Sequence, residues 1–155
     1  MGSASGAVTE FKGHIECGPP VRSETSKQAG DHQEFRGGAW APTATEMSDP
    51  RLAGTYTISS DTDVYPGSGS GQYTLGSERW RIKTSEGAWE TSFAYLEFPD
   101  GYVSTVTTPL VGEGAYDGLF AIWEADFLGD AGCAWDIRGV IFPAAPPAPP
   151  IPPDL

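Results

Sequence analysis

The chain has no long hydrophobic run and little positive charge. None of its apolar runs is long enough to span a bilayer, although 39% of its 155 residues are hydrophobic. Only 9 residues are Lys or Arg, against 21 Asp or Glu, which gives a net charge of −12. Nucleic acids and anionic membrane surfaces both attract clustered cations. The composition therefore argues against nucleic-acid binding and membrane insertion, and the acidity favours solubility.

Several motifs of catalysis and targeting are also missing. The start shows no basic region followed by an apolar one, so no signal peptide is predicted, and residues 1–6 are interpreted as an expression scar or disordered start. The chain has no phosphate-binding loop. The two histidines, His14 and His32, stand at no metal-ligand spacing, so we expect no metal and no cofactor. His14 and Glu16 are predicted to share one face of a strand. They form either an acid–base pair or a surface pair.

One acidic segment has the beginning of a calcium loop but not its remainder. Asp61-Thr62-Asp63 precedes a Gly- and Ser-rich stretch. Pro66 stands where such a loop needs glycine, and Gln72 stands where it needs a bidentate glutamate. The segment is therefore predicted to be a solvated turn.

Two cysteines, Cys17 and Cys133, allow a single disulfide. Cys17 follows the first strand-like run, and Cys133 precedes the last one. The first and last strands of a closed antiparallel barrel are neighbours, so the two cysteines fall at the seam. We predict a disulfide there, and with it a secreted or extracytoplasmic protein of bacterial type. Two separate buried thiols, in a cytoplasmic protein, are the alternative.

Glycine and proline divide the chain into short segments without helical periodicity. Pro99-Asp100-Gly101 is a strong hairpin turn, and 17–31 is predicted to be a polar loop. The strand candidates are 8–15, 32–36, 40–47, 52–59, 73–83, 88–98, 102–111, 115–127 and 134–142. This pattern predicts an all-β domain over 7–143, a single closed antiparallel β-barrel of about eight strands.

The segment from Gly112 to Gly118 carries glycines at 112, 114 and 118 between two strand candidates. A glycine on a strand marks a bulge, a tight bend or a close backbone approach. Bends of this kind let strands curl into a barrel. We therefore assign Gly112, Gly114 and Gly118 a structural role.

This segment resembles the allene oxide cyclase and dirigent proteins, which carry a Gly-x-Gly-x-aromatic-x-Gly bend between two late barrel strands. Here the bend reads Gly112-Glu113-Gly114-Ala115-Tyr116-Asp117-Gly118, followed by a strand from Leu119 to Phe127 and a last strand from Trp135 to Phe142. The resemblance covers roughly the last third of the chain. It implies a barrel of this type, and similar barrels include bacterial cyclases that orient hydrophobic substrates without a cofactor. The motif is structural, so it transfers no catalytic residue.

Large aromatic residues are the main resource for binding. Trp89, Tyr95, Trp123 and Trp135 lie on predicted strands, where inward aromatics either fill a small barrel or line a ligand cavity. We predict that these four contact an apolar ligand. Both faces of 88–98 and 119–127 are partly apolar, so a second subunit or the chain's own tail is expected to cover the outer face.

Polar groups on these apolar strands are the candidate catalytic residues. Glu97, Tyr95 and Arg138 are the clearest, and His14 is added for its neighbouring glutamate. A buried charge must be paired or have a function, and Arg138 is predicted to pair with Glu97 or Asp136.

The C-terminal segment 144–155 is rich in proline and is predicted to be a polyproline II tail, either a spacer or a ligand for an aromatic groove. A docked tail is favoured over a free one. Two functions stay open. One is a barrel that binds a small hydrophobic molecule and acts as a cofactor-independent cyclase or isomerase by orienting it. The other is a secreted, non-enzymatic binding or assembly module with a filled barrel.

Overall fold

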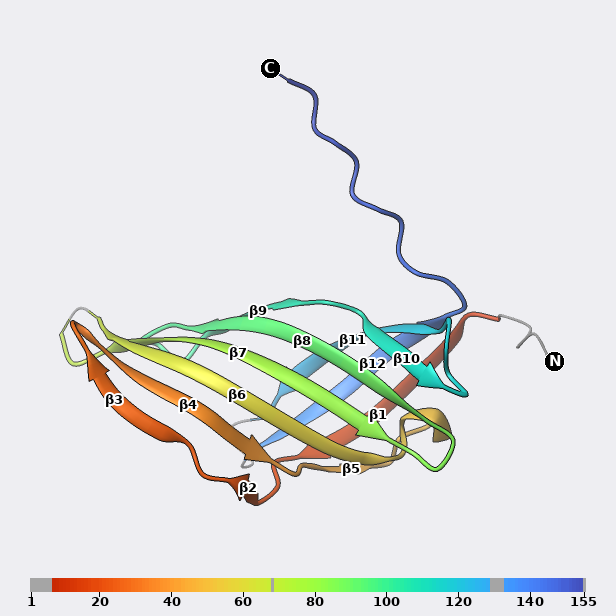
Figure 1. The fold of residues 1–155 in the computed structure, drawn as a ribbon, viewed down its shortest axis with the longest axis horizontal. Coiled ribbons are helices and arrows are strands. Elements are labelled where there is room, and N and C mark those ends of the chain that lie inside the picture. Colours follow the sequence, from red (N-terminus) through yellow and green to blue (C-terminus); the bar gives the residue numbers. More distant parts are fainter. Residues whose placement is uncertain (1–6, 68, 129–132, 155) are drawn as a thin grey trace.

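The computed structural model describes residues 7–67, 69–128 and 133–154, which form an antiparallel β structure with one short 3₁₀ helix (Figure 1). The elements are β1 (Thr9–Glu16), β2 (Pro20–Arg22), β3 (Thr25–Ala29), β4 (His32–Trp40), β5 (Thr43–Thr45), η1 (Pro50–Leu52), β6 (Thr55–Pro66), β7 (Gln72–Lys83), β8 (Gly87–Glu97), β9 (Val103–Thr107), β10 (Leu110–Gly114), β11 (Phe120–Phe127) and β12 (Ala134–Phe142). The predicted all-β class is confirmed.

The strands form one strongly curled sheet, not the predicted closed barrel of about eight strands. Its order is β2-β4-β6-β7-β8-β10-β11-β12-β1-β5, with β3 added to β4 and β9 to β8. Among the described residues, no ladder joins β2 to β5, so the sheet is open. Only Ala41 and Pro42 separate β4 from β5, so the chain itself passes from one side of the opening to the other. Proline has no N–H for a ladder, which explains the break at this point.

One part of the sheet extends beyond the ends of β11 and β12. β6 and β7 pair over their full length, from Thr55↔Lys83 to Pro66↔Gln72, whereas β11 and β12 stop pairing at Phe127↔Trp135. In Figure 1 the long strands β4, β6, β7 and β8 run well past the ends of β11 and β12. We call this projecting part the arm. Among the described residues, the β11–β12 ladder of the opposite wall does not continue past Phe127 and Trp135 along the arm.

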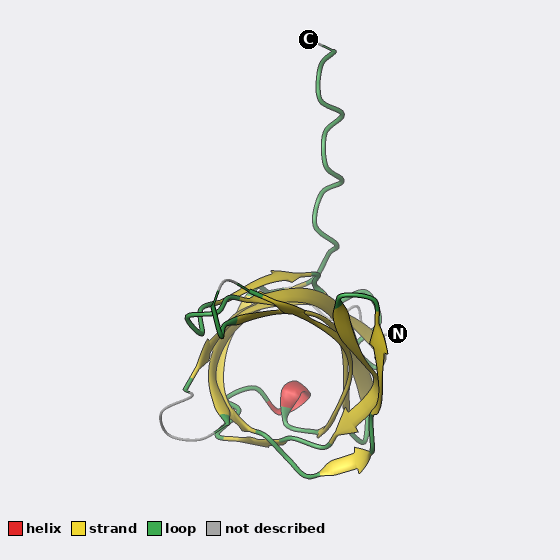
Figure 2. Cartoon of the chain, turned by 90° about the vertical axis from the view of Figure 1, so that its left-hand side faces the viewer, coloured by secondary structure: helices red, strands yellow, loops and turns green. Residues whose placement is uncertain are grey.

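The other end of the curled sheet is filled. Viewed along the axis of the sheet, η1 lies inside its outline (Figure 2). Leu52 of η1 is fully buried, and its carbonyl accepts a hydrogen bond of 2.7 Å from the Tyr56 hydroxyl. The Trp89 indole N–H donates to the carbonyl of Arg51 at 2.9 Å. Apolar burial and satisfied backbone carbonyls thus close this end.

The glycine-rich bend connects β10 to β11, as predicted. Gly114 and Gly118 have φ of 67° and 82°, in the left-handed region that favours glycine. A Cβ on Gly112 would lie 2.1 Å from the carbonyl oxygen of Tyr116, so a larger residue cannot fit. The Tyr116 ring stacks on Trp89 with centroids 5.3 Å apart. The bend therefore anchors the turn to the filled end.

The predicted disulfide is present. Cys17 and Cys133 are bonded, with Cα atoms 5.3 Å apart. The Cys17 N–H also donates to the Cys133 carbonyl at 2.8 Å. The cysteines stand at the end of β1 and the start of β12, which pair from Thr9↔Ile141 to Glu16↔Ala134.

Two local predictions are wrong. The segment 17–31 is not a loop throughout, because β2 and β3 form there and pair with β4. Asp61-Thr62-Asp63 is not a turn, because it continues β6 and pairs with β7. In both places polar residues form strands because a neighbouring strand supplies the hydrogen-bond partners, which outweighs their low strand propensity.

The tail is not docked, contrary to expectation. Residues 143–154 are exposed and extend away from the sheet (Figure 1), with Ile151 at 94% exposure. The outer face keeps exposed apolar side chains, among them Val111 and Ile122 at 44% each. Within this chain, the tail therefore does not cover them. The described residues contain no helix that is long and apolar enough to cross a membrane.

Candidate functional site

The inner face of the arm carries two rows of side chains from β6, β7 and β8. Ser60, Glu78 and Phe93 stand opposite one another in the first row. In the second row, Gly76 lies between Thr62 and Tyr95. These residues alternate with the outer face along each strand, so they share the side on which Trp80 is buried.

Glu78 is the acidic group of this inner face. Its Oε2 accepts a hydrogen bond of 2.8 Å from the indole N–H of Trp80, two residues further along β7. Burial raises the pKa of the Glu78 carboxyl, and the indole hydrogen bond offsets part of that rise. A carboxyl group in this environment holds its proton at a higher pH than an exposed glutamate. It can therefore donate a proton as an acid and recover it as a base.

Tyr95 lies beside Glu78 on the next strand. Burial is the largest cause that raises its pKa to about 12, and the Glu78 charge adds to the rise. The Tyr95 ring covers Gly76, where a Cβ would approach the ring carbons to 2.3 Å. Glycine at this cross-strand position is what allows the ring to lie flat along the inner face. Tyr95 is thus held as a neutral hydroxyl donor.

Aromatic rings form the floor below these polar groups. Trp80 is packed by Trp123 and Trp135, with ring centroids 5.8 and 5.9 Å away. Phe93 lies 6.1 Å from Trp80 on the other side. The Phe127 ring lies tilted against Trp135, with centroids 5.5 Å apart, but remains 54% exposed, although it belongs to the inner face of β11. The rim above the floor is therefore open to solvent.

A hollow of about 630 Å³ lies on β6, β7 and β8. Its lining includes Ser60, Glu78 and Phe93 of the first row together with outer-face residues such as Ser77, Arg79 and Ser92. Another of about 650 Å³ lies beside η1 and the turn between β7 and β8, lined by Arg51, Lys83 and others. The inner face of the arm is the place where a titratable pair and an aromatic floor coincide.

The predicted aromatic residues separate into two groups. Tyr95, Trp123 and Trp135 lie at the open inner face. Trp89 does not, because it is completely buried at the filled end, where it stacks on Tyr116. The sequence places all four on strands, but only the register and the curl of the sheet determine which end each one occupies.

The predicted polar residues are mostly elsewhere. Arg138 is on the outer face and pairs with Glu124 at 2.7 Å, not with Glu97 or Asp136 as predicted. The reason is the β11–β12 register, which places Arg138 directly opposite Glu124. Glu97 shares the strand face of Tyr95 but is exposed at the end of β8.

His14 is a member of an outer-face cluster at the seam. Its Nδ1 lies 2.9 Å from Asp136, and its Nε2 lies 3.7 Å from Glu16. The hydrogen bond to Asp136 is the largest of the causes that raise the pKa of His14. The cluster lies on the outer face of β1 and β12, on the side of the sheet opposite to Trp135 and the aromatic floor.

Sequence reasoning missed Glu78, the most informative polar residue of the site. Its signal was the alternation Gly76, Glu78, Trp80, Ile82, which places a carboxylate on the apolar face of β7. Ser60 was also missed, because β6 was expected to end at residue 59.

The comparisons with known proteins add no relative. No protein-family model, curated protein or solved structure matches this chain. The function is therefore inferred from the site alone.

Proposed function

We propose that the protein binds an apolar small molecule on the inner face of the arm and rearranges it by proton transfer, as a cofactor-independent isomerase or cyclase. The observation that carries this proposal is the half-buried Glu78 carboxyl beside Tyr95, above the floor of Trp80, Trp123 and Trp135. The floor would hold the apolar body of the ligand through burial and ring contacts.

Each residue has a distinct task in this proposal. Glu78 transfers the proton, and its raised pKa suits a group that must both give and accept one. Tyr95 donates a hydrogen bond to a substrate oxygen as negative charge develops there. Trp123 and Trp135 orient the substrate, which lowers the entropic part of the barrier.

The test uses a neutral fluorophore and a simple reaction. N-phenyl-1-naphthylamine should bind saturably, and Trp135→Ala should weaken its binding about tenfold or more, since a large contact surface is lost. An apolar β,γ-unsaturated ketone should be converted to its conjugated isomer, in which Glu78 removes a proton from the α carbon and returns it to the γ carbon. Glu78→Gln should slow this conversion by about 10²–10⁴-fold while the fluorophore still binds.

A matched control and two contrary outcomes complete the test. Glu124→Gln removes the same charge from the exposed outer face, where Glu124 is 70% exposed, and should leave the conversion unchanged. Conversion that survives Glu78→Gln would contradict the acid–base role. Absence of both binding and conversion would overturn the whole proposal.

A second function is supported by a different observation. The filled end and the Trp80 cluster occupy much of the interior, while the exposed proline tail and outer apolar residues offer contact surface. These features favour a non-enzymatic binding or assembly module. Failure of the fluorophore to bind a stable, folded protein would favour this module.

A further inference from the structure

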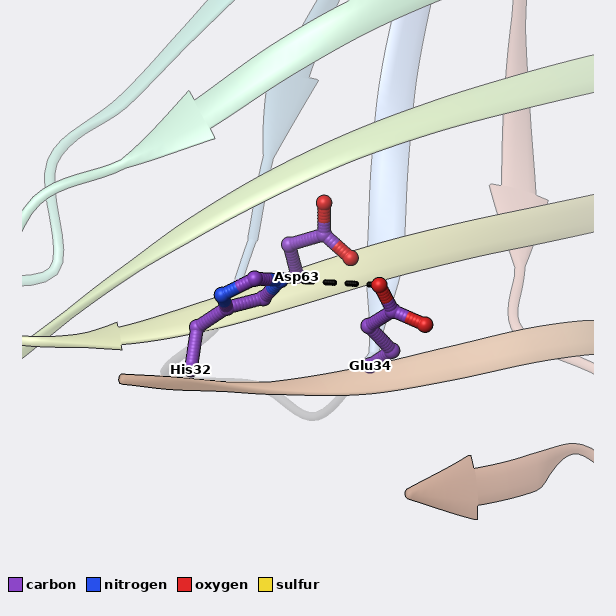
Figure 3. A group of neighbouring side chains, drawn as sticks. All are labelled: His32, Glu34 and Asp63. Atoms are coloured by element: carbon purple, nitrogen blue, oxygen red, sulfur yellow. Dashed lines mark ion pairs between the residues drawn. The ribbon is translucent and has the colours of Figure 1, made fainter. Parts of the chain in front are cut away.

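A histidine and two carboxylates meet on the outer face of the arm, away from the site just described. His32 and Glu34 stand two residues apart on β4, and Glu34 is the direct cross-strand partner of Asp63 on β6. One ligand atom from each lies within 4.8 Å of those of the other two (Figure 3). The side chains are only 19–24% exposed. The sequence predicted no metal because the third ligand comes from a strand 29 residues away.

The His32 ring is held in an orientation that suits a ligand. Its Nδ1 lies 3.2 Å from a carboxylate oxygen of Asp31, and its ring stacks on Tyr65 with centroids 4.6 Å apart. A carboxylate on Nδ1 fixes the tautomer and leaves Nε2 free to coordinate. Nε2 faces Glu34 Oε1 at 3.6 Å, on the side where the second carboxylate lies.

Asp63 provides the second carboxylate, and its Oδ1 is buried. The cation that faces this oxygen is the Arg36 guanidinium, whose Nη2 lies 2.7 Å away. A buried carboxylate needs a positive partner, and a metal ion can take the place of the guanidinium.

We propose that His32, Glu34 and Asp63 form a binding site for a divalent transition-metal ion, with Zn²⁺ as its reference ligand. One imidazole with two carboxylates is a donor set for such ions and is not the all-oxygen set that Ca²⁺ and Mg²⁺ prefer. Bonds of about 2.1 Å would bring tetrahedral ligand atoms to about 3.4 Å from one another, a small closure that side-chain rotation can supply. Three protein ligands leave a coordination position for water or a substrate.

Two basic side chains compete with the ion. Arg36 Nη2 lies 3.5 Å from Glu34 Oε1 in addition to its contact with Asp63, and Lys27 Nζ lies 3.2 Å from Glu34 Oε2. They balance the two carboxylate charges when no metal is bound. Binding therefore has to displace the Arg36 guanidinium from between the carboxylates.

The experiment titrates the full chain with Zn²⁺ by calorimetry, and with Co²⁺ by its visible absorption, which reports coordination directly. We expect one ion per chain. His32→Ala and Asp63→Asn should each weaken Zn²⁺ binding at least tenfold, and Asp31→Asn should weaken it about tenfold. Ca²⁺ at the same concentrations should give no comparable heat.

The control is the second histidine of the chain. His14 also lies near two carboxylates, those of Asp136 and Glu16, so His14→Ala tests adventitious surface binding. It should leave the affinity unchanged. If His14→Ala weakens binding as much as His32→Ala, or if His32→Ala has no effect, the proposal is overturned.

Arg36→Gln separates a metal site from a simple ion-pair network. Removal of the competing cation should tighten Zn²⁺ binding severalfold, even if the variant is less stable. If the three side chains serve only to pair with Arg36 and Lys27, neither the wild type nor this variant will bind the ion, and the proposal fails.

Discussion

Glu78 shows how one residue can link stability to chemistry. Its carboxyl lies on the same strand face as Trp80 and Ile82, where burial disfavours the charged form. The folded state therefore binds the Glu78 proton more tightly than the unfolded chain does, for which the ordinary pKa is 4.5. The same environment that suits proton transfer makes ionised Glu78 a cost to folding.

The sign of this effect gives a prediction about pH. Well below pH 4.5, Glu78 is protonated in both the folded and the unfolded state, so its ionisation does not affect the free energy of unfolding there. As the pH rises from 4.5 through the raised folded pKa, the free energy of unfolding falls, and above that pKa the loss is complete. Glu78→Gln removes this loss, so its melting temperature relative to wild type should increase across the same window.

Thermal melts of both proteins at several pH values from 4 to 8 would measure this difference. Glu124→Gln removes one carboxylate from the exposed outer face and serves as the control. If wild type and Glu78→Gln respond to pH in parallel, burial of Glu78 has no energetic consequence.

At the scale of the elements, the bend between β10 and β11 needs glycine because its backbone conformation and its close contacts leave little room for a side chain. Gly114 has a φ of 67°. A Cβ added at this position would lie 3.2 Å from both the Glu86 carbonyl oxygen and the Gly87 Cα. The pairing of Gly114 with Gly87 brings β10 and β8 into close approach. A branched side chain would meet both an unfavourable φ and a neighbouring strand.

Gly114→Val should therefore destabilise the protein by about 2–4 kcal/mol, since unfavourable φ in a non-glycine residue alone costs about 1–3 kcal/mol. Chemical denaturation would measure the change in the free energy of unfolding. Asp117→Asn in the same turn keeps the shape of the side chain and should change it by less than about 0.5 kcal/mol. Equal effects of the two substitutions would remove the special role given to Gly114.

For the whole molecule, the disulfide is the strongest constraint on the unfolded chain. Cys17 and Cys133 are 116 residues apart, and the bond closes nearly the whole sheet into one loop. Chain-entropy arguments assign such a loop a stabilisation of about 4–5 kcal/mol, which is an upper value. The bond also holds β1 beside β12, so its loss acts on the seam of the sheet.

Thiol titration of the denatured, unreduced protein should count zero free thiols. Cys17→Ser combined with Cys133→Ser should lower the melting temperature by on the order of 10 °C, from the loss of several kcal/mol in a protein of this size. Two reactive thiols in protein prepared under oxidising conditions would contradict the bond. An unchanged melting temperature would show that the ladder between β1 and β12 holds the seam alone.

The sequence determined the parts of the fold that depend on local pattern. Alternation and turn residues placed β7, β8 and β12 within about a residue of their observed bounds. The glycine spacing indicated the β10–β11 bend, and the positions of Cys17 and Cys133 predicted the disulfide. These features follow from steric limits on single residues and from strand order, and the sequence alone indicates both.

The tertiary structure decided what depends on register and curl. Whether the sheet closes depends on the break at Ala41 and Pro42, and the polar strands β2 and β3 form only because β4 supplies hydrogen bonds. Strand pairing places Glu78 next to Tyr95 and Asp63 opposite Glu34. Pairing joins residues that are distant in the chain, and no local pattern encodes which strand will be the partner.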